Sequence, residues 1–465
     1  MDIPEQNNAP KSGDKPAKKT EKPAEKPDAA APAPQQSASA PQQGEQTPQQ
    51  DIAEYQYYED YGYDENPYFI THSPLKRKHI LTIVFSGIFL IAFVSYFVFT
   101  KVVQFSAPFA IGISGERATL GIHSPSVMFE PRASWIWMAY AAITQKPEES
   151  HPRIDINLAT SLAGGGRWAF HHNVFESRKA VLHGPNGNVL ENDGMWRYET
   201  PSLVYDPEDK GREWKIYAYR YYWDGDVTSA RRYSAIVYRY AENIALKNWS
   251  REHWLFSATQ DQPPAPYSEF VQLRLNELDP SLEKVLYYSQ PSALYSKTAG
   301  VLFMTLTVYM EENKPDRIIL LASTDHGASW GYLGAVLSTE DAPKLGKYTR
   351  VDSGYLFEQD ENIYLMASFG DQKQEHQGTH IFKFADIAEA KLARDKKGRL
   401  KVMQYFKPIG PENLTPLGAG QSAYIPELYK SGLLMSHMQT DDTGPPFRIY
   451  RSNQMVKEKT GFFSR

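Results

Sequence analysis

The chain has 465 residues, enough for about two or three ordinary domains or for one large β domain with added segments. Its formal net charge is only −5, so no basic excess points to nucleic acid as a partner. The absence of cysteine excludes disulfides, cysteine-ligated metal centres and thiol nucleophiles. No motif of a zinc protease, an NTPase, an α/β-hydrolase or a dinucleotide enzyme is present, so we expect neither a metal nor another cofactor.

Residues 1–75 are expected to form a disordered cytoplasmic tail. Residues 1–50 hold nine prolines and eight glutamines, and they bury too little apolar surface to fold. Residues 51–70 combine six tyrosines with six acidic residues. Two interpretations of this second segment remain open: a docking or phosphorylation site for a cytoplasmic protein partner, or a juxtamembrane linker.

An apolar run predicts one transmembrane helix over residues 79–103. Residues 80–100 contain no charged side chain, and a helix of this length spans about 30 Å, the thickness of a bilayer core. Three basic residues, 76–78, precede the run, and a single Lys101 follows it. Because positive charge favours the cytoplasmic side, we expect a single-pass cell-membrane protein whose N-terminus is cytoplasmic and whose C-terminal domain is periplasmic or extracellular. The alternative is a buried core helix, which the lack of a polar face disfavours.

Residues 105–465 are predicted to fold as β-sheets. Short runs rich in Tyr, Val, Ile and Trp alternate with turns that contain Gly, Pro, Asp and Asn. Five segments share a small or polar opening, an apolar strand, a turn and a second strand, and they align on Ser126, Ser202, Ser292, Ser353 and Ser422. Their spacing suits one four-stranded blade per segment, so we predict an all-β fold, a five-bladed β-propeller. A β-sandwich is the alternative.

Residues 323–330 match the Asp-box, S-x-D-x-G-x-S/T-W, which is found in sialidase-like propellers. In this motif the Asp and Gly stabilise a tight hairpin turn, and the Trp packs between neighbouring sheets. A degenerate copy, residues 161–168, has Ala163 in place of the Asp. The motif indicates the fold and not a catalytic site.

With these repeats, the region over about residues 115–455 resembles the five-bladed β-propeller carbohydrate enzymes, a group that includes family-43 glycoside hydrolases such as arabinanases, and the invertases. The resemblance is one of pattern. It implies a central funnel lined by the first strand of each blade, with three acids supplied by the first three blades. Such acids protonate the leaving oxygen and activate water.

The sequence departs from this family pattern at each of the three acids. The corresponding openings read Ser124-Pro125, Thr200-Pro201 and Gln290-Pro291. Glu199 and Asp352 are the two acids near the expected positions, so they are the candidate catalytic pair of any glycoside hydrolase-like activity. The candidate ligand-binding residues at the funnel are His123, Ser124, Thr200, Gln290 and Gln421.

Two aromatic residues, Trp196 and Tyr198, directly precede the second segment. Their rings suit stacking on a sugar, so they are further candidates for ligand binding. The competing interpretation is that both rings pack between blades.

Two functions remain open from the sequence. The first is a membrane-anchored β-propeller outside the cytoplasm that binds or processes a glycan or polysaccharide, without the usual three-carboxylate set. The second is a non-enzymatic scaffold for protein interactions, linked through its tail to a cytoplasmic partner. Whether the protein is an enzyme stays undecided at this point, because a pair of carboxylates facing each other across the funnel distinguishes hydrolysis from binding.

Overall fold

A computed structural model gives the structure of the protein. It describes residues 82, 85–93, 109–130, 133–162, 165–183, 189–226, 233–257, 273–311, 314–371, 373, 376–407, 421–427, 432–438 and 444–452. The chain divides into two units, Met1–Arg77 and Lys78–Arg465, and all the described residues belong to the second. The predicted tail, residues 1–75, lies outside them.

The predicted membrane span is described only in part. Residue 82 and residues 85–93 are helical, and the rest of the predicted span 79–103 lies outside the described residues. Within the part of the chain that the structure describes, no helix is long and apolar enough to cross a bilayer.

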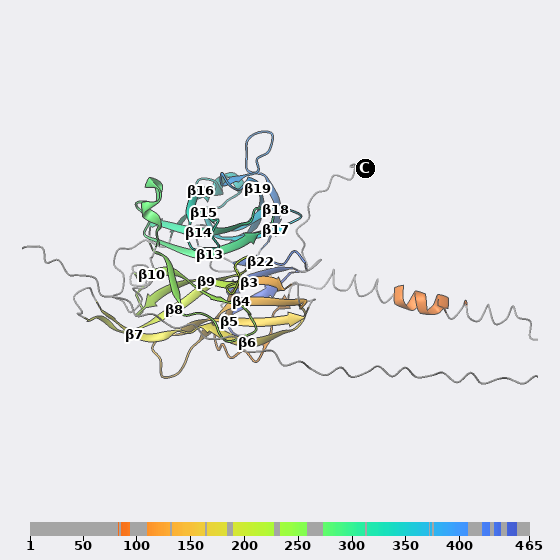
Figure 1. The fold of residues 1–465 in the computed structure, drawn as a ribbon, viewed down its shortest axis with the longest axis horizontal. Coiled ribbons are helices and arrows are strands. Elements are labelled where there is room, and N and C mark those ends of the chain that lie inside the picture. The colour runs from red at the N-terminus through yellow and green to blue at the C-terminus, as the bar shows by residue number, and fades with distance from the viewer. Residues whose placement is uncertain are drawn as a thin grey trace, which may run out of the picture. The chain divides into compact units, whose positions relative to one another are not determined.

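Antiparallel strands, joined in chain order, make up the first three sheets (Figure 1). The first contains β3 (Gly121–Glu130), β4 (Trp135–Thr144), β5 (Arg153–Leu162) and β6 (Trp168–Phe175). The second contains β7 (Arg178–His183), β8 (Val189–Tyr205), β9 (Trp214–Trp223), β10 (Ser234–Ala241) and β11 (His253–Ser257), with the short parallel β12 (Leu273–Arg274) at its edge. The third contains β13 (Tyr287–Ser296), β14 (Val301–Glu311), β15 (Lys314–Ser323) and β16 (Gly331–Ser338).

Two further groups of strands complete the all-β region. The fourth contains β17 (Arg350–Gln359), β18 (Asn362–Gly370), β19 (His376–Asp386) and β21 (Val402–Phe406), with β20 (Lys391–Leu392) on β19. The fifth contains β22 (Ser422–Tyr424), β23 (Leu433–Met438) and β24 (Phe447–Arg451). The N-terminal β1 (Phe109–Ala110) pairs with β24, so both ends of the β region share one sheet. The short β2 (Ile113–Ser114) pairs with β6. The short helices are η1 (Leu275–Glu277), η2 (Pro280–Leu282) and α3 (Ala342–Leu345).

One strand of each group contacts its counterparts in a cycle; we call these strands, β3, β8, β13, β17 and β22, the first strands, although β7 precedes β8 in the second group. β3 contacts β8, β8 contacts β13, β13 contacts β17, β17 contacts β22, and β22 contacts β3. The hydrophobic clusters follow the same cycle, because each is shared by two successive sheets, including the fifth and the first. These first strands therefore lie between hydrophobic cores on both sides.

Strand β9 illustrates why an aromatic-rich sequence suits this arrangement. Successive side chains of a strand point to opposite faces. Tyr217 and Tyr219 belong to the cluster shared with the third sheet, whereas Ile216 and Ala218 belong to the cluster shared with the first. Both faces are buried, so the strand carries apolar or aromatic side chains on each of them.

Serine hydroxyl groups join the first strands of consecutive sheets. Ser126 Oγ accepts a hydrogen bond from the amide of Leu203 at 2.8 Å. Ser202 Oγ accepts one from the amide of Ala293 at 2.7 Å. Both serines are buried, so the repeated serine predicted from the sequence has a structural role between sheets.

The third such bond corrects one sequence prediction. Ser292 Oγ accepts a hydrogen bond from the amide of Leu356 at 2.9 Å. In the two earlier bonds, the donor is the residue directly after the repeated serine of its own sheet: Leu203 follows Ser202, and Ala293 follows Ser292. The residue before Leu356 is Tyr355, so Tyr355 occupies the serine position of the fourth sheet. The alignment of Ser353 with the other serines is therefore wrong by two residues. The cause is a Ser-Gly pair that resembles the small polar opening of the other segments.

Ser126→Ala is expected to lower the free energy of unfolding by about 1–3 kcal/mol, because the buried amide of Leu203 then has no acceptor. Urea unfolding of the parent and the variant measures the loss. Ser150→Ala is the matched control, since Ser150 is exposed, and it should change little. Equal stability of the parent and Ser126→Ala would contradict a structural role for the repeated serine.

The segment that matches the Asp-box forms a tight turn between β15 and β16. Asp325 accepts hydrogen bonds from the amide and hydroxyl of Ser329, and the Gly327 amide donates to Ser323 Oγ at 2.7 Å. Gly327 has φ of 95°, and a Cβ there would lie 3.1 Å from the Tyr217 hydroxyl, so glycine is required. The turn places Trp330 against the second sheet, as the sequence predicts.

Candidate functional site

A β-bulge interrupts the first strand of four sheets, near the start of β3, β13 and β17 and in the second half of β8. The pairing register shifts between His123 and Ser126, Glu199 and Ser202, Ser289 and Ser292, and Asp352 and Gly354. In each bulge one non-glycine residue has φ between 50° and 54°, namely Ser124, Thr200, Gln290 and Ser353. This left-handed conformation costs about 1–3 kcal/mol for such residues, and strain of this kind gathers at functional sites.

The bulges surround a very narrow space, here called the waist. Ser124, Thr200, Gln290 and Gln421, four of the predicted ligand-binding residues, line it together with Ser353. Its volume is about 20 Å³, which suits roughly one water molecule and is too small for a sugar ring. The structure brings these polar residues together around one space, and a sugar would have to bind beyond them.

The residues just before the bulges gather at one end of the waist. Because Ser124, Thr200 and Ser353 line one space, their chain neighbours His123, Glu199 and Asp352 border the same end of it. Two arginines lie on the same strands, two positions earlier than the acids, and therefore on the same faces. We call this set the entrance cluster; it consists of His123, Arg197, Glu199, Arg350 and Asp352.

Asp352 is a buried carboxyl group with incomplete hydrogen bonding. It is 5% exposed, and its Oδ1 has no hydrogen-bond partner among the described residues. Burial raises the pKa of the carboxyl group, while Arg350, Gln290 and the backbone of Ser353 oppose that rise. Gln290 Oε1 accepts from the Thr307 hydroxyl and the Ser353 amide, which fixes the Gln290 side chain beside Asp352.

Glu199 and Arg197 form the part of the cluster on the second sheet. The Tyr221 hydroxyl donates to Glu199 Oε1 at 2.5 Å. Arg197 is buried, its guanidinium lies 4.9 Å from the centre of the Trp223 ring, and its Nε and Nη2 have no hydrogen-bond partner among the described residues. Burial lowers the pKa of Arg197, whereas Tyr221 and Glu199 raise it. A donor and an acceptor group thus lie on one face of β8.

His123 completes the cluster from the first sheet. Its Nδ1 lies 2.6 Å from Ser124 Oγ, and its Nε2 has no partner among the described residues. Burial lowers the pKa of His123, and the charge of Glu199 partly offsets that effect. The imidazole is therefore neutral near pH 7, and it offers one nitrogen to a ligand.

Four tyrosines connect the two predicted catalytic acids across three sheets. Tyr221, which bonds Glu199, stacks on Tyr219 with 5.2 Å between ring centres. Tyr287 and Tyr309 stack at 4.1 Å, and Tyr219 lies 6.5 Å from Tyr287. Burial raises the pKa of the Tyr309 phenol, and the charge of the Asp352 carboxylate raises it further, so the stack ends beside that acid.

Trp196 and Tyr198, the two aromatic residues predicted to stack on a ligand, point to the other face of β8. The Tyr198 hydroxyl donates to Glu252 at 2.7 Å, and Glu252 also forms a buried ion pair with Arg220. Arg220 lies 4.0 Å from the centre of the Trp196 ring. Both rings therefore pack within the protein around an ion pair, and the structure does not bring them to the entrance cluster.

The sequence analysis missed both arginines of the cluster. A usable signal was present, because Arg197 and Glu199 repeat the spacing of Arg350 and Asp352, an Arg two positions before an acid that directly precedes a small polar residue. Within the residues that the structure describes, no group of three His, Asp or Glu side chains has the arrangement of a metal site.

Asp352→Asn is expected to stabilise the protein at pH 7 more than at pH 4. A carboxyl group whose pKa is raised on folding loses its stabilising contribution as the pH rises from its unfolded value, about 3.9, through its folded value. Asparagine has no such loss. Urea unfolding at both pH values measures the difference.

Asp395→Asn provides a control of opposite sign. Arg399 lowers the pKa of the partly exposed Asp395, so this substitution should destabilise the protein at pH 7, and the effect should shrink as the pH falls. A pH-independent difference between Asp352→Asn and the parent would mean that Asp352 is solvated.

Comparisons with known proteins show a remote structural likeness. No family model matches the chain, and no curated protein matches it. Among solved structures, it is similar to the NanB sialidase of Streptococcus pneumoniae, with 11% identity over 74% of this chain and 69% of that chain and a TM-score of 0.39. It is similar to the Bacillus subtilis arabinanase Arb43A, with 15% identity over 73% and 96% and a TM-score of 0.41. It is also similar to the Bombyx mori β-fructofuranosidase BmSUC1, with 12% identity over 76% of this chain and 64% of that chain and a TM-score of 0.40. These are enzymes of the kinds that the sequence resembles, and the function is inferred below from the residues of this chain.

Proposed function

We propose that residues 105–465 form a five-bladed β-propeller that binds a glycan at the entrance cluster. The blade count is supported by the cycle of contacts from β3 through β8, β13, β17 and β22 back to β3. The clusters shared by successive sheets, and the pairing of β1 with β24, support closure of that cycle.

The observation that carries the glycan proposal is the set of buried polar atoms without partners. These atoms are Asp352 Oδ1, Arg197 Nε and Nη2, and His123 Nε2, and none has a hydrogen-bond partner among the described residues. Native proteins leave few such atoms, and each costs about 1–3 kcal/mol when it is buried unpaired. A ligand rich in hydroxyl groups supplies donors to the carboxylate and acceptors to the guanidinium, so a sugar satisfies both kinds.

Binding, rather than hydrolysis, is the activity we propose. Hydrolysis of a glycosidic bond requires one group that protonates the leaving oxygen and another that activates water or attacks the sugar. Asp352, whose pKa is raised by burial, has the character of the first. Glu199 is the only candidate for the second group. Because its Oε1 already accepts a hydrogen bond from Tyr221, this oxygen is less suited to accept a proton from water, and binding is the activity we favour.

Membrane attachment is a second part of the proposal, and it is supported by the sequence. The uncharged run 80–100 follows the basic residues 76–78, which favours a cytoplasmic N-terminus. Protease added to intact cells or spheroplasts should digest the β domain and spare the tail. Digestion of the tail alone would reject this topology.

A glycan-array screen of the detergent-solubilised full-length protein tests the binding proposal. We expect one class of glycan to bind, and Arg197→Met and Asp352→Asn each to weaken that binding at least about tenfold, since hydrogen bonds to charged groups contribute about 1.5–3 kcal/mol. Arg399→Met is the matched control, because Arg399 is a largely exposed arginine paired with Asp395. Absence of binding to every glycan, or binding that survives both substitutions, would contradict the proposal.

A further inference from the structure

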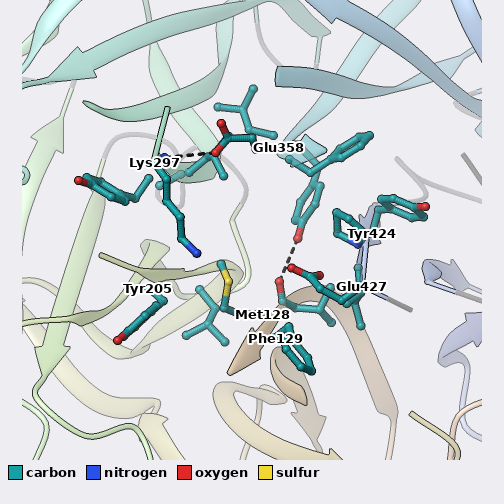
Figure 2. A pocket seen from close by; sticks show the side chains of 17 residues that line it. Met128, Phe129, Tyr205, Lys297, Glu358, Tyr424 and Glu427 are labelled. Atoms are coloured by element: carbon teal, nitrogen blue, oxygen red, sulfur yellow. Dashed lines mark hydrogen bonds between the residues drawn. The ribbon is translucent and has the colours of Figure 1, made fainter. Parts of the chain in front are cut away.

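A second cavity lies at the opposite end of the first strands, where they leave the waist. Its volume is about 250 Å³, and residues near the ends of β3, β8, β13 and β17 line it together with the segment after β22. Figure 2 shows this hollow, with Met128, Phe129, Tyr205 and Tyr424 around it. We call it the far cavity.

Tyr355 separates the far cavity from the waist. Tyr355 lines both spaces, and its hydroxyl donates to the Val127 carbonyl at 3.2 Å, which ties β17 to β3. The waist beyond it is too narrow for a ligand to pass. The far cavity is therefore a site of its own and not an extension of the entrance cluster.

Most of the wall of the far cavity is apolar or aromatic. Met128, Phe129 and Tyr205 are half-buried, so their side chains are partly covered yet accessible from the hollow. Leu203 and Leu356 are buried and also contribute to the wall. Such walls favour an apolar ligand body, and the volume suits a small ligand, since pockets for drug-sized molecules have about 300–1,000 Å³.

Charged groups of both signs border the far cavity. Glu358 accepts hydrogen bonds from the Ser296 hydroxyl and the Lys297 amide, both at 3.2 Å, so its carboxylate fixes the end of β13. The Lys297 ammonium has no carboxylate within ion-pair distance among the described residues, and the exposed Glu427 likewise has no ion-pair partner there. Figure 2 shows the ammonium and the Glu427 carboxylate on different sides of the hollow.

We propose that the far cavity binds a small zwitterion with an apolar body, whose ammonium and carboxylate groups lie at separate ends, as in a dipeptide with an aromatic side chain. Lys297 pairs with the carboxylate, Glu427 pairs with the ammonium, and the aromatic wall holds the body between them. A simple anion would meet two carboxylates, and a simple cation would meet Lys297. A zwitterion therefore matches the charge of this cavity better than either.

Isothermal titration calorimetry of the full-length protein with glycyl-L-phenylalanine tests this inference. Two analogues remove one charge each: N-acetyl-glycyl-L-phenylalanine lacks the ammonium, and glycyl-L-phenylalaninamide lacks the terminal carboxylate. We expect the parent to bind the dipeptide, and each analogue to bind at least about tenfold more weakly, because each loses one charge-assisted hydrogen bond.

Substitutions assign the binding to the far cavity. Lys297→Met and Glu427→Gln should each weaken dipeptide binding by a similar factor, and both residues are exposed, so folding should be retained. Lys344→Met is the matched control, since Lys344 is an exposed lysine paired with Asp341 on α3, and it should have no effect.

Three results would overturn the inference: no dipeptide binding by the parent, binding of either analogue as tight as that of the dipeptide, or dipeptide binding unchanged by Lys297→Met and Glu427→Gln. Asp352→Asn keeps this test separate from the glycan proposal. It should leave dipeptide binding unchanged, and a loss of binding in this variant would place the dipeptide at the entrance cluster instead.

Discussion

Trp330→Ala is expected to lower the free energy of unfolding by about 3–5 kcal/mol, the usual cost of truncating a large buried aromatic side chain. Trp330 is 5% exposed. Its ring meets Tyr217 and Phe256 edge to face, at 6.2 Å and 5.8 Å between centres, and its Nε1 donates to the Gly327 carbonyl. The substitution therefore leaves a cavity between the third sheet and the second, and it also removes the hydrogen bond that anchors the ring.

Chemical unfolding in urea, followed by the change in midpoint, measures this loss. Leu162→Ala is a control on a 68% exposed apolar side chain, and it should change the stability by no more than about 0.5 kcal/mol. The loss of stability in Trp330→Phe should lie between those of Trp330→Ala and Leu162→Ala, because phenylalanine retains part of the contact with Tyr217. A Trp330→Ala variant as stable as the parent would show that the ring contributes nothing between these sheets.

The architecture of the β region was largely predictable from local patterns. The run 214–223 has large apolar or aromatic side chains at seven of its ten positions, a composition typical of a strand buried on both faces. The repeated serine was also visible, because Ser126, Ser202 and Ser292 each follow a proline. The fourth repeat was misaligned because Tyr355 replaces the serine there, and its hydroxyl bonds the backbone of β3 instead.

The candidate site was predictable in its location but not in its depth. Sequence reasoning placed Ser124, Thr200 and Gln290 at a funnel, and the structure places them around one space, but that space is a waist of about 20 Å³. The bulge decides this outcome, because it turns one residue into the left-handed conformation and leaves its predecessor at the entrance. A bulge depends on pairing with the next strand, which single-strand patterns do not reveal.

The partners of the site residues were hidden for a similar reason. Tyr221 reaches Glu199 across the β8–β9 hairpin, and its sequence neighbours Tyr219 and Tyr222 are equally plausible partners before the register is known. Trp196 and Tyr198 were expected near a ligand because they directly precede the first-strand opening. The alternation of β8 instead directs both toward Arg220.

The second large effect that we expect is the absence of glycoside hydrolysis by the parent protein. The parent should hydrolyse chromogenic arabinosides and xylosides no faster than buffer. The sequence resemblance implies that Ser124, Thr200 and Gln290 correspond to the three acids of the family pattern, and neither a hydroxyl nor an amide exchanges a proton with water or a glycosidic oxygen near neutral pH. Loss of one such acid or base typically costs about two to four orders of magnitude in rate.

Glu199→Gln and Asp352→Asn complete this experiment, because these two acids are the remaining candidates for a catalytic pair. If the parent hydrolysed a glycoside and either substitution abolished that turnover, the protein would be an enzyme. Asp352 would then be the acid, because burial raises its pKa and keeps its proton bound to higher pH. Turnover that survived both substitutions would instead place the chemistry away from the entrance cluster. No turnover by the parent, together with glycan binding that is lost in Arg197→Met, is the result we expect. A guanidinium whose Nε and Nη2 lack partners among the described residues can hold a sugar hydroxyl or carboxylate, but it cannot supply the proton that hydrolysis needs.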